Sequence, residues 1–296
     1  MFSYDKKTTG IYTAVDMKSK SAKLVYWILW AIMLLFAMCC FLPPLWILLS
    51  SMKDTKEFLQ IPPTLFPKRF DIGKVAEVWK TLDFVKYYIN TVVLAVGDVV
   101  FMILINGLAG YVISRLKPKG ASLISILVLW TMMLPGTVSM IPLFKTYIDV
   151  PYLHVNLTNT YWPMWLMSGA QAFYVMLFKN FFDTIDMALV EAARIDGCND
   201  FKIFTRIMLP LSVPIIATVS IFTVNGAWGN FFWPFLLLKN TEIQTVSVEL
   251  YNLKQSGYAM DKYMVALLLS IIPPSIIFVL FQRHIMGGIN IGGVKG

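Results

Sequence analysis

Charged side chains are scarce in this chain. They make up 14% of its 296 residues, whereas hydrophobic residues make up 57% and the mean hydropathy is +0.67. That composition leaves too little polar surface to cover a soluble globule of this length. Its apolar runs, many of about 20 residues or more, match a hydrocarbon core ~30 Å thick, which helices can cross because they pair their own backbone groups. We therefore expect an integral membrane protein.

Cysteine, histidine and nucleotide-binding motifs are also rare or missing. The cysteines are Cys39, Cys40 and Cys198, and His154 and His284 lie far apart in the sequence. This spacing fits neither a disulfide framework nor a metal site. The sequence also has no G-x-x-x-x-G-K-S/T phosphate loop to hold ATP. We expect a protein that is not an enzyme, with no catalytic residue, metal or cofactor of its own.

Apolar runs predict an all-α fold with about six transmembrane helices. The runs lie near residues 24–49, 88–114, 121–143, 159–178, 211–238 and 263–282. The first is too long for a signal-peptide core and no small-residue cleavage site follows it, so we expect it to remain as a helix. We expect an N-terminal segment, 1–23, and one transmembrane domain, 24–296. Within that domain, Gly73–Leu82 is weakly amphipathic and predicts a surface helix.

Basic residues indicate the orientation of the chain. The net charge is +8, but Lys and Arg are scattered through loops and not gathered on one face, so we expect no nucleic-acid partner. Six spans would put both termini on the same side. The basic segment before the first span and the short-loop cluster Arg115, Lys117 and Lys119 favour the cytoplasmic side for both.

A polar region interrupts the apolar pattern at residues 183–210, which we call the island. Asp186 is placed to cap a helix that starts at Met187, and Gly197 is a natural stop for it. Asn199 and Asp200 can cap a second helix, Phe201–Met208, before Pro210. Two interpretations remain open from the pattern alone. The island either docks a partner protein or lies as an amphipathic helix on the lipid surface.

The island also carries a longer motif. The run Glu191-Ala192-Ala193-Arg194-Ile195-Asp196-Gly197 is followed after nine residues by Ile207-Met208-Leu209-Pro210. This resembles the E-A-A-x-x-x-G-x9-I-x-L-P signature of permease subunits of binding-protein-dependent ABC importers, whose type I fold has about six spans. Many members have a proline shortly before the acidic residue, where this chain has Asp186.

The resemblance implies a set of partners and contact residues. In that family this segment is the coupling helix, which inserts into one of two cytoplasmic ATPase subunits that bind ATP and Mg. Glu191 would contact the ATPase, Ala192 and Ala193 would permit close packing, Gly197 would make the turn, and Arg194 and Asp196 complete the predicted coupling set. A second homologous permease, an extracytoplasmic solute-binding protein and a bacterial or archaeal cell membrane are also implied.

Further segments resemble the second permease of the sugar-importer branch. They include Tyr88-Ile89-Asn90-Thr91, Ala109-Gly110-Tyr111, Met133-Leu134-Pro135 and the tail 283–296. The resemblance implies carbohydrate as the substrate, either an oligosaccharide or a related saccharide. It also makes Lys295 and Gly296 candidate ATPase contacts, although a glycine-rich end is equally expected to fray. In the external loop, Glu242, Glu249, Tyr251 and Asn252 become candidate contacts for the solute-binding protein, and a solvated linker is the alternative.

Candidate substrate contacts lie in the fifth apolar run. Saccharides offer hydroxyls and apolar ring faces, so amides and aromatic rings suit them. Asn225, Trp228, Asn230 and Trp233 form such a set and resemble a W-N/G-D/N-F-x-W-P segment of the family. Ordinary interhelical packing, with tryptophan at the membrane interface, is the alternative and is the more favoured one.

Asp98 is the single carboxylate well inside an apolar run. An intramembrane charge can serve a proton relay or bind substrate, but a structural or cavity-facing role is favoured because no second membrane carboxylate extends a relay. An ion-coupled secondary transporter or a channel is therefore the alternative to an ATP-driven importer. A membrane scaffold without transport is a third possibility.

Overall fold

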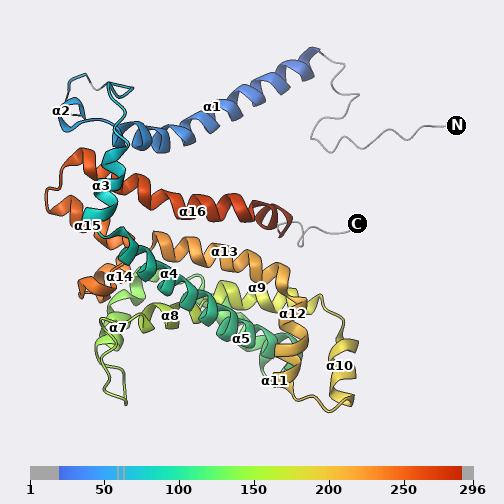
Figure 1. The fold of residues 1–296 in the computed structure, drawn as a ribbon. Helices are drawn as coiled ribbons and strands as arrows, with labels where there is room; N and C mark the ends of the chain where they lie inside the picture. Colours follow the sequence, from blue (N-terminus) through green and yellow to red (C-terminus); the bar gives the residue numbers. More distant parts are fainter. Residues whose placement is uncertain (1–19, 59, 63, 289–296) are drawn as a thin grey trace.

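The computed structural model describes residues 20–58, 60–62 and 64–288 and contains helices but no strand within those ranges. Figure 1 shows an elongated helical bundle with short helices at both ends. The long apolar helices are α1 (Lys20–Ser51), the span that begins with α4 (Phe84–Phe101), and α16 (Met260–Gly288). These three are long and apolar enough to cross a membrane. The all-α prediction is therefore confirmed.

The α4 span continues without a break to Leu116. It contains a π-helical turn, η2 (Met102–Asn106), then α5 (Gly107–Tyr111) and a second π-helical turn, η3 (Val112–Leu116). The whole stretch Phe84–Leu116 passes as one span. It lies through the middle of the bundle in Figure 1, between α13 and the α8–α9 pair.

Three other predicted spans are interrupted. They form the pairs α6 (Ala121–Thr131) with α7 (Gly136–Ile148), α8 (Trp162–Gly169) with α9 (Ala172–Asp183), and α13 (Val213–Gly229) with α14 (Phe232–Leu237). The prediction of one continuous helix over residues 121–143 is corrected, because α6 and α7 meet at a bend of 100°. Pro135 explains the break, since a proline disfavours helical backbone at the residue before it and cannot donate a backbone hydrogen bond. In the described part, three helices qualify as spans. The count rises to five if α6 with α7, and Asp200–Leu211 with α13 at a bend of 81°, each form one span, so the count of six is not confirmed.

Short helices gather at one end of the bundle. These are α2 (Thr55–Phe58), α3 (Gly73–Thr81), the 3₁₀ turn η5 (Thr241–Ile243) and α15 (Val246–Gln255). Helix α3 confirms the predicted surface helix. Helix α15 was missed, because its sequence was interpreted as an external loop. A buried ion pair joins Lys74 of α3 to Asp261 of α16 at 3.0 Å, which attaches this end to a long helix.

The island forms the opposite end of the bundle. It contains α10 (Met187–Ile195), α11 (Asp200–Ile203), the π-helical turn η4 (Phe204–Met208) and α12 (Leu209–Leu211). Helix α1 begins and α16 ends on the same side of the molecule as α10 (Figure 1). An apolar core that includes Phe178, Phe182, Val190 and Phe204 holds the island against the bundle.

Candidate functional site

Local hydrogen bonds define both ends of α10. The Asp186 carboxylate accepts a hydrogen bond from the Ala188 backbone N–H at 3.0 Å, which confirms it as the N-cap. Gly197 has a φ of +78°, a left-handed conformation that L side chains adopt only at a cost in energy. Asn199 caps α11 by accepting a hydrogen bond from the Lys202 N–H at 2.9 Å. The predicted helix, turn and helix are therefore all present.

The predicted coupling residues divide between surface and core. Glu191, Ala192, Arg194, Asp196 and Gly197 are exposed. Ala193 is buried against the core of this chain, so its prediction as part of the surface for close packing is corrected. The reason is helical geometry: Val190 and Ala193 are three residues apart and share the inward face of α10.

Arg194 has an ion-pair partner within this chain. Its guanidinium donates to Asp200 Oδ1 at 3.0 Å and so joins α10 to α11. The sequence had placed Arg194 only in the predicted coupling set, without a partner inside this chain. Glu191 keeps its place on the exposed side of the helix.

Two exposed apolar side chains on the island were missed by the sequence analysis. Ile195, at the end of α10, is 87% exposed, and Phe201 on α11 is 64% exposed. A signal was available, because both are bulky apolar residues in a segment whose neighbours are polar. Large apolar groups exposed beside polar residues are typical of an interaction surface.

Buried polar contacts attach the island to the central span. The Arg115 guanidinium, at the end of η3, donates to the backbone carbonyls of Phe182 and Ile185. The Ser114 hydroxyl donates to Asp183 Oδ1 at 2.6 Å. Burial would raise the pKa of Asp183, but hydrogen bonds from Lys179 and Ser114 and the charge of Lys179 hold it below the ordinary value. These contacts hold the segment before α10 against the end of Phe84–Leu116.

The four predicted substrate contacts are not brought together. Trp228 is buried, and its indole N–H donates to the Ser270 carbonyl at 3.0 Å. Trp233 packs in another cluster, with its ring 6.3 Å from that of Tyr147. Asn225 is partly buried on α13, and of the four residues only Asn230 lines the cavity described next. Asn225 and Trp228 lie on α13, whereas Trp233 lies on α14, so the interruption between these helices separates Trp233 from the first two.

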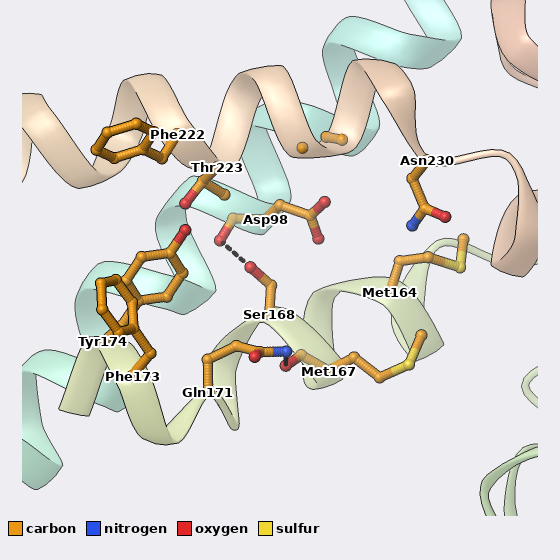
Figure 2. A pocket seen from close by; sticks show the side chains of 12 residues that line it. Asp98, Met164, Met167, Ser168, Gln171, Phe173, Tyr174, Phe222, Thr223 and Asn230 are labelled. Carbon is orange, nitrogen blue, oxygen red and sulfur yellow. Dashed lines mark hydrogen bonds between the residues drawn. The ribbon is translucent and has the colours of Figure 1, made fainter. Parts of the chain in front are cut away.

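A cavity of about 290 Å³ lies between α4, the α8–α9 pair and α13, and we call it the Asp98 cavity. Figure 2 shows the Asp98 side chain pointing into it between the other helices. Asp98 is only 7% exposed, and no hydrogen bond to its Oδ1 atom is found among the described residues. The cavity is lined by Asp98, Met164, Met167, Ser168, Gln171, Phe173, Tyr174, Phe222, Thr223, Gly226, Ala227 and Asn230. Except for Asp98 and Asn230, none of these was predicted, because they come from three distant segments.

The candidate contacts of the opposite end have unequal exposure. Glu242 is exposed and lies 3.5 Å from the Lys86 ammonium, and Tyr251 is exposed at the edge of a group of rings with Phe231 and Phe235. Asn252 donates to Gln244 Oε1 at 3.1 Å. Burial raises the pKa of Glu249 above the ordinary value, although hydrogen bonds with Tyr87 and Asn252 oppose that rise. Glu242 and Tyr251 are therefore the more accessible members of the set.

Two further predictions concern the ATPase contacts in the tail and metal binding. Lys295 and Gly296, the candidate contacts in the tail, lie outside the described residues. Within the described ranges, no group of three or more His, Cys, Asp and Glu side chains could hold a metal ion.

Comparison with known proteins identifies the family to which this chain is similar. Residues 103–290 match the family described as binding-protein-dependent transport system inner membrane component. The arabinooligosaccharides transport system permease protein AraQ of Halalkalibacterium halodurans is 29% identical over 284 residues, which cover 95% of this chain and 100% of that protein. The diacetylchitobiose uptake system permease protein NgcG of Streptomyces coelicolor is 28% identical and the match covers 88% of this chain and 86% of that protein.

A solved structure shares the fold over nearly its full length. It is a bacterial ABC transporter involved in the import of the acidic polysaccharide alginate, and the matched chain is 26% identical with a TM-score of 0.75. The match covers 93% of this chain and 99% of that one. The interrupted helices, the island and the long apolar spans are thus the features of a known transporter architecture, and this chain belongs to the family of inner membrane components of binding-protein-dependent transport systems.

Proposed function

We propose that this chain is a permease subunit of an ATP-driven ABC importer for carbohydrate, an oligosaccharide or a related saccharide. The observation that carries the proposal is the full-length similarity to permeases that are named for the transport of arabinooligosaccharides and diacetylchitobiose. A second homologous permease would form the other half of the translocation path. The chain itself has no phosphate loop, so two cytoplasmic ATPase subunits would bind ATP and Mg.

The exposed face of α10 is the proposed docking surface for an ATPase subunit. Glu191 supplies a charge, Ala192 lets another backbone approach, and Ile195 offers an apolar anchor. A short helix with such a face fits a groove in a partner. Because Arg115 and Ser114 hold the start of the island, displacement of α10 by ATP binding would tilt the central span and switch the path between inward-facing and outward-facing states.

The orientation proposed from the charge pattern would expose the end of the bundle that carries α15 to a solute-binding protein outside the cell. If the island and both termini are cytoplasmic, α15 and η5 face outward across a bacterial cell membrane. Glu242 and Tyr251 are then positioned to meet a docked solute-binding protein. The long loop before α4 would lie on the same side.

An ion-coupled secondary transporter is the competing function, and the Asp98 cavity is the observation that favours it. A buried carboxylate in a membrane helix can bind a cation or exchange a proton. In that mechanism the island would have no motor to dock, and uptake would depend on an ion gradient.

The two functions are separated by reconstituting the complex in liposomes and measuring saccharide uptake with ATP inside. The variant combines Glu191→Ala with Gly197→Pro. Proline cannot adopt the positive φ of Gly197, so the turn after α10 is lost, and the first substitution removes the exposed charge. We expect the variant to insert normally, lose association with the ATPase subunits and lose most ATP-driven uptake.

Glu242→Ala is the matched control for ATPase association, because it removes another exposed carboxylate, at the opposite end of the bundle. It should retain the ATPase subunits at the wild-type level. ATP-driven uptake that persists unchanged in the Glu191→Ala, Gly197→Pro variant would contradict the proposed function. An uptake that instead follows a proton or sodium gradient would favour the competing one.

A further inference from the structure

Two helix interruptions meet at the Asp98 cavity. Helix α8 ends at Gly169 and α9 begins at Ala172, while α13 ends at Gly229 just before Asn230. Interrupted backbone at membrane depth is tolerated only where it is buried in protein or lines a cavity, because lipid offers no hydrogen bonds. The position of both interruptions is therefore consistent with a cavity that holds polar contents.

A buried side chain stabilises the first interruption. Asn106 is 0% exposed; its Nδ2 donates to the Ser168 carbonyl at 2.9 Å, and its Oδ1 accepts from the Gln171 N–H at 3.0 Å. The backbone of this interruption is thus held in place by the protein. Ser168 lies just before it, Gln171 lies within it, and both line the cavity. This part of the cavity wall is therefore held by hydrogen bonds within the protein.

The Asp98 carboxylate lacks a partner within the described residues. It forms no ion pair there, and its buried Oδ1 accepts no hydrogen bond. The neighbouring Ser168 hydroxyl donates at 3.0 Å to the backbone carbonyl of Asp98 and not to its carboxylate (Figure 2). The Gln171 amide likewise donates to the Met167 carbonyl, at 3.0 Å. A buried carboxylate without donors is costly, so its donors are expected to come from outside this chain.

Aromatic rings form part of the same wall. Phe173 and Tyr174 of α9 and Phe222 of α13 line the cavity beside the polar groups (Figure 2). A sugar ring presents hydroxyl donors at its edge and apolar C–H groups on its faces, and these match a carboxylate acceptor and aromatic side chains. The volume of about 290 Å³ is near the lower end of ligand pockets, which run from about 300 to 1,000 Å³. The cavity therefore suits one ring and not a whole oligosaccharide.

We propose that the Asp98 cavity is a subsite on the translocation path for one uncharged sugar ring, whose hydroxyls donate hydrogen bonds to the Asp98 carboxylate. The proposal rests on the proposed import of carbohydrate and narrows its substrate class. A uronate ring would bring a second negative charge close to Asp98 in a medium of low dielectric constant, where like charges repel strongly. Neutral saccharides should therefore pass and acidic ones should be rejected.

The test uses the complete reconstituted complex with saturating binding protein and ATP. The probes are arabinotriose, diacetylchitobiose and trigalacturonate. Gly226→Leu adds a side chain at the cavity wall, at a position where an added Cβ would meet nothing within 4 Å. Gly229→Leu is the matched control, because its Cβ is equally free and Gly229 does not line the cavity. Asp98→Asn is a second variant that keeps the size of the side chain but removes its charge.

We expect wild-type uptake of a neutral probe and not of trigalacturonate. Gly226→Leu and Asp98→Asn should lower uptake at least tenfold while ATP hydrolysis stimulated by the binding protein is retained, and Gly229→Leu should remain near wild type. Unchanged uptake by Gly226→Leu, or trigalacturonate uptake by the wild type, would overturn the subsite alone. An assembled wild type that hydrolyses ATP but carries none of the probes would overturn both the subsite and the proposed carbohydrate import.

Discussion

Arg115 is the residue that most directly attaches the island to the membrane helices. Its guanidinium is buried and donates to the carbonyls of Phe182 and Ile185, immediately before the cap of α10. Phe182 lies in the last turn of α9, where its carbonyl also accepts from the Ile185 backbone N–H at 3.0 Å, and Ile185 lies in the link that leads to α10. One side chain thus holds both the end of α9 and the segment that leads into α10.

Replacing Arg115 by alanine should destabilise the protein. The loss of two charge-assisted hydrogen bonds from a buried site should lower the free energy of unfolding by about 3 kcal/mol. Thermal unfolding of the detergent-purified protein measures this, and Lys119→Ala, an exposed change in the same short loop, should alter the free energy of unfolding by less than about 0.5 kcal/mol. Equal effects of the two substitutions would show that Arg115 does not hold the island.

At the level of helices, α5 and α9 can approach closely because Gly110 has no side chain. A Cβ added at Gly110 would lie 2.8 Å from the Phe178 Cβ and 2.9 Å from the Lys179 backbone nitrogen. Small residues allow such contacts between membrane helices, whose packing cannot rely on the hydrophobic effect. The contact also positions α9, which carries Phe173 and Tyr174 of the Asp98 cavity.

We predict that Gly110→Ala separates these two helices. The backbone of α9 must move to admit the methyl group, which should cost about 1–3 kcal/mol of stability. Gly229→Ala adds the same methyl group where nothing lies within 4 Å, so it should be neutral or slightly stabilising. Melting temperatures of both variants in detergent compare them directly, and a loss as large for Gly229→Ala would exclude the packing explanation.

For the molecule as a whole, function depends on which side of the membrane the island faces. The start of α1, the end of α16 and the island share one end of the bundle, and α3 and α15 lie at the other (Figure 1). Coupling to cytoplasmic ATPase subunits requires the first of these ends to be inside the cell.

Thiol labelling tests this orientation. In a background with Cys39→Ser and Cys40→Ser, the native Cys198 reports on the island, and Ser256→Cys reports on the exposed end of α15. A membrane-impermeant maleimide added to intact cells should label Ser256→Cys at once and Cys198 only after the membrane is opened. Immediate labelling of Cys198 would place the island outside and remove the basis for ATPase coupling.

Features that depend on local chemistry were predictable. The caps at Asp186 and Asn199 and the turn at Gly197 follow from side-chain hydrogen bonding and backbone freedom within a few residues, and all three occur. The helical fold follows from the length and apolarity of the runs, which only helices can carry through lipid. The interruptions at 132–135, 170–171 and 230–231 were not predicted. Average hydropathy does not reveal them, because the residues of an apolar segment stay apolar where a helix stops.

The composition and the motif of this chain were therefore enough to predict a helical membrane protein with a polar helix–turn–helix island, since both depend on residues close together in the chain. Tertiary packing alone decided that Ala193 faces inward, that Arg194 pairs with Asp200, and that Asp98 opens onto a cavity. Each of these depends on which side of a helix meets another element. The cavity in particular joins α4, α8, α9 and α13, and such a juxtaposition exists only once the helices have packed.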